Sequence, residues 1–317
     1  MKILFAAILA MILAGCAAPG LQIDHSYTAK GQSSRVKFVV LHYTVSDRPT
    51  SLNILTQQVV SAHYLLTDEA KPVIYNLVDE SRQANHAGVS YWKGYTELNA
   101  SSIGIEIVNP GFTEGPHGRI WYPYPQAQID QLIVLLKDIV ARHHIPPQNV
   151  IGHSDVAPTR KEDPGPMFPW RQLAAAGLAV WPDDARVAAA RAGYDAAPPD
   201  VTWFQQRLAQ YGYAVPQNGQ LDSATRAVIS AFQMKYRPAT IDGTPDSETA
   251  ALLDALTVAP AAPAPAAAPA QPLAPVPPLA PAPPLAPVPP PAPAPPLAPP
   301  PPLAPAPLPA PVPAPAK

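Results

Sequence analysis

Runs of apolar residues alternate with polar turns through the first part of the chain and predict interleaved strands and helices. Residues 62–67 and 72–78 are two strand-like runs joined by a polar turn. Between residues 126 and 144 the apolar positions recur at helical spacing, with prolines on both sides of the segment. The first domain is therefore expected to be α/β or α+β and to end near Trp181.

Two further apolar strands each carry one conspicuous polar residue. In residues 35–43, alternation places His42 on the same face as Val40. In residues 102–109, the isoleucines share one face and Glu106 lies on the other. Because a carboxylate is costly to bury without a partner, Glu106 is a candidate functional residue.

The second folded part is expected to be small and helical. Apolar stripes at helical spacing within residues 200–257 predict three helices. Residues 218–225 and 242–249 have similar sequences, and each contains an Asp-Ser pair where a helix N-cap is expected. The alanine- and arginine-rich residues 182–199 are interpreted as a linker between the two parts.

The proline content shows where the folded part of the chain ends, and the net charge restricts its possible partners. The chain has 317 residues, of which 47 are proline, and residues 258–317 consist almost wholly of proline and alanine. Such a segment lacks the residues for a packed core and is expected to be a disordered, polyproline-like tail. It is either a spacer or wall-threading arm, or a tail without a partner. The formal net charge of −2 offers no basic field for nucleic acid.

The N-terminal residues are typical of an export signal. Lys2 precedes an apolar run at residues 3–13 that is too short to span a bilayer unaided. The run ends in Leu-Ala-Gly-Cys, which resembles the lipobox of bacterial lipoproteins and implies a signal peptide at residues 1–15. Cys16, the only cysteine, would then be lipidated, anchoring the protein in the cell envelope, at the outer membrane facing the periplasm, with residues 16–34 as a leader. The alternative is a plain secretory signal with an incidental buried cysteine.

The segment with the most candidate chemistry is IGHSDVAPTRKEDPGPMFPW, residues 151–170. Its prolines predict an irregular, stiff loop on which side chains can be aimed. A catalytic zinc site needs three nitrogen or oxygen ligands and an open position, and His42, His153 and Asp163 could supply them. Taken singly, each histidine is also typical of a hydrogen-bonded structural or surface residue.

Several motifs in order resemble one enzyme family. GHSDVAPTRKEDPGP, with VVLHYT, SAHYL, NHAG and SIGIEIVN before it, resembles the zinc-dependent N-acetylmuramoyl-L-alanine amidases of the type 2 amidase and peptidoglycan recognition protein family. The resemblance covers residues 35–181 and implies an α/β fold with a mixed central sheet flanked by helices. It also implies one Zn²⁺ per chain and cleavage of the amide between the lactyl group of N-acetylmuramic acid and L-Ala of the stem peptide.

The resemblance carries roles to individual residues. His42, His153 and Asp163 match the zinc ligands, Glu106 the catalytic carboxylate, and Lys161 the lysine beside the metal. Physical reasoning agrees, because zinc on two neutral imidazoles and one carboxylate keeps a net charge of about +1 and activates water. Glu106 can then act as the general base, and Lys161 can stabilise the oxyanion.

Other positions are candidates for substrate contact or support. His86, in Asn-His-Ala-Gly, matches a substrate-facing position, although many relatives have an aromatic residue in place of Asn85. Asn109 is a further substrate candidate, and His63 is either a site residue or a hydrogen-bonded strand histidine. Asp155 either orients a ligand imidazole or makes loop hydrogen bonds.

The helical part resembles the peptidoglycan-binding domain of wall hydrolases, through residues 218–225 and the Ala-Val and Phe-Gln pairs that follow. Asn218 and Asp222 depart from the usual Asp and Gly. The expected partner is peptidoglycan. Two other functions stay open: a non-catalytic wall-recognition protein, which would be expected to lose Asp163 or Glu106, and a zinc endopeptidase of the stem peptide. Product analysis separates the enzymes, since only the amidase releases a peptide that begins with free L-Ala.

Overall fold

The computed structural model describes residues 23–116 and 118–258. The predicted lipidation site Cys16 and the predicted signal peptide lie outside the described residues, as does all but the first residue of the proline- and alanine-rich tail. Within the described residues, no helix combines the length and the apolar character that a bilayer crossing requires.

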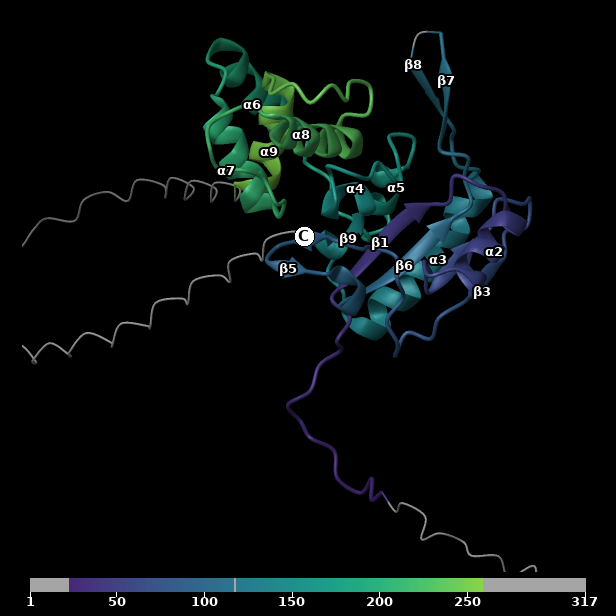
Figure 1. Ribbon diagram of the computed structural model, residues 1–317. Helices are drawn as coiled ribbons and strands as arrows, with labels where there is room; N and C mark the ends of the chain where they lie inside the picture. The colour runs from purple at the N-terminus through teal and green to yellow at the C-terminus, as the bar shows by residue number, and fades with distance from the viewer. Residues whose placement is uncertain (1–22, 117, 259–317) are drawn as a thin grey trace, which may run out of the picture. The chain divides into compact units, whose positions relative to one another are not determined.

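A five-stranded sheet forms the framework, in the order β3-β2-β6-β1-β9 (Figure 1). Four strands are parallel, and β3 pairs antiparallel with β2 at one edge. The strands are β1 (Phe38–Tyr43), β2 (Tyr64–Leu66), β3 (Ile74–Asn76), β6 (Ser102–Ile107) and β9 (Val150–Gly152). Helices flank this sheet, so the predicted mixed α/β fold is confirmed.

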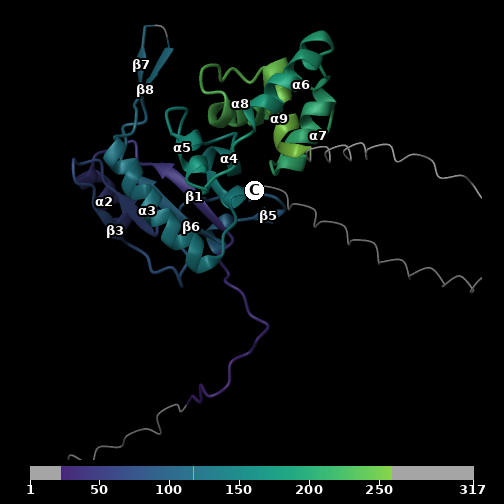
Figure 2. The ribbon, with the colours of Figure 1, turned by 180° about the vertical axis from the view of Figure 1, so that it is seen from behind.

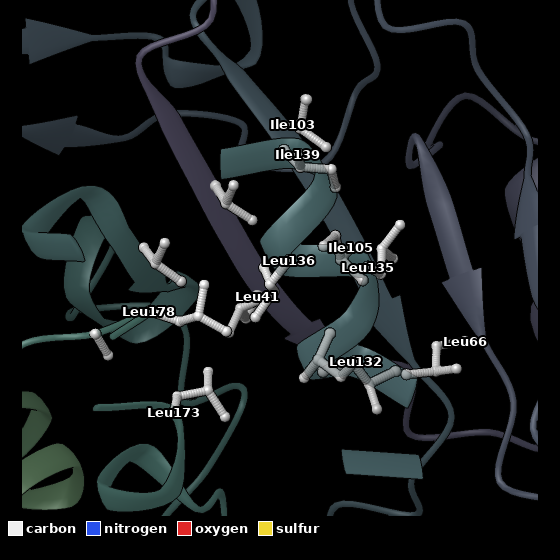
Figure 3. Close-up of a cluster of buried hydrophobic side chains, with 14 of the residues drawn as sticks. Leu41, Leu66, Ile103, Ile105, Leu132, Leu135, Leu136, Ile139, Leu173 and Leu178 are labelled. Carbon is white, nitrogen blue, oxygen red and sulfur yellow. The ribbon is translucent and has the colours of Figure 1, made fainter. Parts of the chain in front are cut away.

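One face of the sheet is covered by α3 (Gln126–His143), which crosses the strands in the view from behind (Figure 2). Figure 3 shows its leucines and isoleucine meeting alternate residues of β1 and β6, such as Leu41 and Ile105. These side chains are buried. The alternation expected from the sequence is therefore present, and it leaves His42 and Glu106 to the opposite face.

The opposite face carries a second apolar core. Phe38 and Val40 of β1 and Ile151 of β9 belong to one buried cluster that also contains Phe204 and Phe232 from the C-terminal helices. A third, smaller cluster lies under α2 (Arg48–Gln57). The sequence pattern did not predict α2, because its apolar positions are few.

The helices α6 to α9, called the helical region below, follow the first domain. Three aspartates cap α7, α8 and α9 by accepting hydrogen bonds from backbone amides, and two of them are the predicted Asp-Ser positions, Asp222 and Asp246. The sequence assigned no helix to residues 182–199, but α6 occupies most of them and contacts α9. The helices are α6 (Asp184–Ala196), α7 (Val201–Tyr211), α8 (Ser223–Tyr236) and α9 (Ser247–Thr257).

Shorter elements complete the described residues. An irregular loop was predicted for residues 151–170, but the segment that follows β9 begins with the short helix α4. The hairpin of β7 and β8 projects away from the sheet (Figure 1). The remaining elements are β4 (Tyr91–Trp92), β5 (Tyr95–Thr96), η1 (Leu98–Ala100), β7 (Phe112–Gly115), β8 (Gly118–Trp121), η2 (Pro147–Asn149), α4 (His153–Val156) and α5 (Trp170–Ala175).

Candidate metal centre and active site

Parallel strands bring the candidate residues to one end of the sheet. Strands β1, β6 and β9 run in the same direction, so their carboxyl ends meet at one edge. His42 and Glu106 are direct neighbours in the register of β1 and β6. His153 follows β9 immediately as the first residue of α4. The topology therefore gathers three residues that are far apart in sequence.

Asp163 joins them through the loop after α4. The backbone amide of Ser154 donates a hydrogen bond to the Asp163 carbonyl at 2.8 Å, which ties the two ends of this loop together. His42, His153 and Asp163 are 1%, 3% and 6% exposed. These three residues form the one group of potential metal ligands found among the described residues.

The three potential ligand atoms form a compact triangle. His42 Nδ1 lies 2.9 Å from His153 Nδ1 and 2.9 Å from Asp163 Oδ2, and the third edge is 3.0 Å. Donors bonded to a tetrahedral metal at about 2.0–2.1 Å are separated by about 3.3 Å. The triangle is close to that size.

Hydrogen bonds behind His42 fix which nitrogen faces this triangle. The Ser102 hydroxyl donates to the Leu98 carbonyl at 2.5 Å, so its oxygen accepts from His86 Nε2 at 3.1 Å. His86 Nδ1 then accepts from His42 Nε2 at 3.0 Å. The lone pair of His42 Nδ1 is therefore left to point at the triangle.

The same holds for His153. Its Nε2 lies 3.1 Å from the Ala87 carbonyl, which can only accept, so Nε2 carries the proton and Nδ1 the lone pair. Burial, and then the neighbouring His153, lower the pKa of His42 to about 4. Burial alone would raise the pKa of Asp163, but His153 and His42 lower it overall. Two imidazole lone pairs and a carboxylate thus converge without a proton between them, and this donor set fits a divalent cation.

Glu106 extends the site beside the triangle. Its Oε2 is buried and has no hydrogen-bond partner among the described residues. Burial, followed by the charge of Asp163, raises the pKa of the Glu106 carboxyl, while Lys161 opposes this shift. A partly buried carboxylate with one enclosed, unpartnered oxygen and a raised pKa, next to potential metal ligands, has the properties of a proton-transfer group.

A pocket of about 600 Å³ opens over these residues, and Lys161 lines it. Arg119 of β8 closes part of its wall through an ion pair with Glu162 at 2.6 Å. The lining also includes His42, Glu106, His153, Asp163, Asn85 and His86. The candidate catalytic residues and ligands therefore all border one cavity, which is large enough for a ligand of several ring or peptide units.

The three candidates for substrate contact occupy different positions relative to the pocket, and of the three only His86 lines it. His86 lies against Gly104 and bonds to His42, so it supports a ligand imidazole. His63 is fully buried, and its nitrogens contact the Arg82 carbonyl and the Gly104 amide. Asn109, 2% exposed, donates to the carbonyls at residues 122 and 123. His63 and Asn109 thus bond to backbone groups outside the residues that line the pocket, and substrate contact by either stays a prediction.

Asp155 does not contact a ligand imidazole; it accepts hydrogen bonds from Gly152, Tyr213 and Lys235. Of the two expectations for Asp155, loop hydrogen bonding is thus the one observed, with partners from the helical region that the sequence did not indicate. The sequence also missed Ser102. No signal marked it, because a serine at the start of an apolar strand is ordinary.

Comparison with known proteins identifies the family of the chain. Residues 32–166 match the family model described as N-acetylmuramoyl-L-alanine amidase, and residues 197–253 match one described as a putative peptidoglycan binding domain. The chain is 44% identical to N-acetylmuramoyl-L-alanine amidase AmiD of Escherichia coli K12 over 262 residues, which is 78% of this chain and 94% of that protein. The chain belongs to the N-acetylmuramoyl-L-alanine amidase family.

Two solved structures match most of the chain. AmiD from E. coli, in complex with anhydro-N-acetylmuramic acid-L-Ala-D-γ-Glu-L-Lys, matches with a TM-score of 0.69 at 44% identity, over 75% of this chain and 94% of that one. AmpDh3 from Pseudomonas aeruginosa matches with a TM-score of 0.70 at 40% identity, over 75% of this chain and 98% of that one. The family assignment confirms the resemblance drawn from the sequence motifs.

Proposed function

We propose that this amidase hydrolyses the amide between the lactyl group of N-acetylmuramic acid and L-Ala of the stem peptide, with Zn²⁺ bound by His42, His153 and Asp163. The observation that carries the proposal is the convergence of two Nδ1 lone pairs and one carboxylate oxygen beside the Glu106 carboxylate, whose Oε2 is buried without a hydrogen-bond partner among the described residues. Relatives solved with muramyl peptides support the substrate class.

The chain's own residues divide the work. A bound zinc ion supplies Lewis acidity toward the amide carbonyl and activates the attacking water. Glu106, next to His42 in the register of the sheet, takes the proton of that water and returns it to the leaving amine of L-Ala. Lys161 lines the pocket, and its ammonium offsets the negative charge that develops on the carbonyl oxygen.

Location and wall binding belong to the same proposal. Peptidoglycan is the substrate, so the enzyme works in the cell envelope. The lipobox-like residues 13–16 support an acylated Cys16 as the membrane anchor, and one acyl chain alone gives only marginal binding, so stable anchoring needs more than one. The match of residues 197–253 to a peptidoglycan-binding model supports a wall-binding role for the helical region.

Digestion of purified sacculi tests this function. We expect soluble peptides that begin with free L-Ala, no release after exhaustive chelation, and restored release when zinc is added. Peptides cut within the stem would favour the zinc endopeptidase. Binding of sacculi without any release would favour the non-catalytic recognition protein.

A further inference from the structure

A buried carboxylate links the metal-binding loop to the helical region. Asp155, two residues after His153, is 1% exposed. Its Oδ2 accepts from the Gly152 amide at 2.8 Å and from Lys235 Nζ at 2.8 Å, and its Oδ1 accepts from the Tyr213 hydroxyl at 2.5 Å. Both side-chain partners come from the helical region, Lys235 from the last turn of α8 and Tyr213 from the segment after α7.

The ion pair is unusual for its burial. Lys235 is 6% exposed, and its ammonium lies 4.0 Å from the centre of the Trp170 ring. A buried ammonium or carboxylate is costly unless it is paired and hydrogen-bonded. Each charge therefore requires the other, and the pair holds only while α8 stays against α4, which it contacts.

Apolar packing also connects the first domain to the helical region. Trp92, fully buried in the first domain, meets the rings of Tyr213 and Tyr211 edge-on at 5.0 and 5.7 Å. The backbone amide of Lys93 donates to the Gly212 carbonyl at 2.9 Å. One buried cluster runs from the sheet into α7 and α8. The helical region is thus built into the same core as the sheet.

Asp155 is placed where it can control the metal ligands. By accepting from the Gly152 amide it fixes the junction between β9 and α4, from which His153 projects. Two residues further on, the amide of Ser154 donates a hydrogen bond to the carbonyl of Asp163. Two of the three potential metal ligands therefore depend on the backbone that Asp155 holds.

We propose that Lys235 and Tyr213 are positioning residues for the metal centre, acting through Asp155 on His153 and Asp163. The helical region is then a structural part of the catalytic unit, in addition to its proposed wall-binding role. This inference rests on the proposed function for the identity of the metal, but its test does not depend on hydrolysis.

Lys235→Met in the full chain removes the charge and keeps the length of the side chain. Asp155 is left buried and unpaired, so the loop should rearrange to reach water. We expect the affinity for zinc, measured by competition with a chromogenic chelator, to fall about 10-fold or more, as when partners behind metal ligands are lost. Hydrogen exchange of the amides at residues 152 and 154 should become faster.

Arg237→Met is the matched control. Arg237 follows Lys235 at the end of α8, its side chain is 10% exposed, and it pairs at 2.8 Å with Asp246 inside the helical region. This variant should lower the melting temperature yet keep zinc affinity and loop protection. Adding Asp155→Asn to Lys235→Met removes the unpaired charge and should restore much of the zinc affinity.

Tyr213→Phe provides a second test of the proposal if Lys235→Met fails to fold. It removes one hydrogen bond to Asp155 and no charge, so a several-fold loss of zinc affinity is expected. The proposal would be overturned if every variant of Lys235 and Tyr213 that folds kept wild-type zinc affinity and loop protection. An equal loss of zinc affinity in Arg237→Met would also overturn it. A chain that binds zinc tightly but releases no L-Ala peptide would instead contradict the proposed function and leave the positioning role intact.

Discussion

Replacing His86 with phenylalanine tests how the chain presents His42 to the metal. In the structure His86 Nδ1 accepts the proton of His42 Nε2 at 3.0 Å, within a site where His42 is 1% exposed. Without this acceptor, the Nε2 proton has no partner. The other tautomer then becomes competitive and puts a hydrogen on Nδ1, where the metal needs a lone pair.

Two estimates give the size of this effect. A buried donor left without a partner costs about 1–3 kcal/mol. Loss of a partner behind a metal-bound histidine typically lowers metal affinity about 10–100-fold, which corresponds to about 1.4–2.7 kcal/mol. The estimates overlap, so we expect zinc affinity to fall by that factor. Steric change is limited, because Phe is also a flat ring. It can occupy the space that the His86 ring fills against Gly104, where a residue with a Cβ would clash.

The assay is chelator competition on folded protein, with His63→Phe as the control. The His63 ring lies 5.8 Å from the His86 ring and is also buried, but both of its nitrogens bond to backbone groups and not to His42. That variant should lose stability and keep its zinc affinity. Wild-type affinity in His86→Phe, or an equal loss in His63→Phe, would refute the reasoning.

Three further predictions concern Glu106 of the site, the partly exposed ion-pair cluster of Glu80 and Arg142, and Cys16 near the N-terminus. Glu106→Gln should keep zinc and wall binding but lose turnover about 100-fold or more; near-wild-type rates on a soluble muramyl peptide would contradict its role. Although burial opposes ionisation, bonds from Arg142 and Tyr64 lower the pKa of Glu80 to about 2 from 4.5. Its stabilisation is therefore complete above pH 4.5 and lost toward pH 2, so urea titrations should show Glu80→Gln weaker at neutral pH and equal to wild type at low pH. Cys16→Ser should abolish acylation and move the protein to the soluble envelope fraction without changing activity on soluble fragments; firm membrane association would refute the anchor.

Sequence pattern predicted the parts of the site that periodicity governs. Alternation in two apolar strands placed His42 and Glu106 on a common face, because one-residue steps decide the face of a strand, and the register of β1 and β6 makes them neighbours. The helical spacing of residues 126–144 predicted α3 to within one residue. These features are local, so a single sequence contains them.

Features that depend on tertiary contacts were not predictable in the same way. The bond from His86 to His42 joins segments 44 positions apart, and the Lys235–Asp155 pair joins segments 80 positions apart. The sequence motifs marked His86 and Asp155 as candidates, but nothing in the local pattern indicates the residues they bond to. α6 was missed because none of its residues is buried, so its sequence lacks the strong apolar stripe that identifies a core helix. His63 and Asn109 were candidates by residue type, and only the three-dimensional structure shows that their side chains bond to backbone groups.

Hydrolysis in heavy-oxygen water tests the central claim most directly. The full chain with zinc is incubated with a muramyl peptide, and both products are analysed by mass spectrometry. The proposed reaction places the label in the lactyl carboxylate of the muramic acid and leaves an unlabelled peptide with a free L-Ala amine. Label in a carboxylate of the stem peptide, with the muramoyl amide intact, would contradict it.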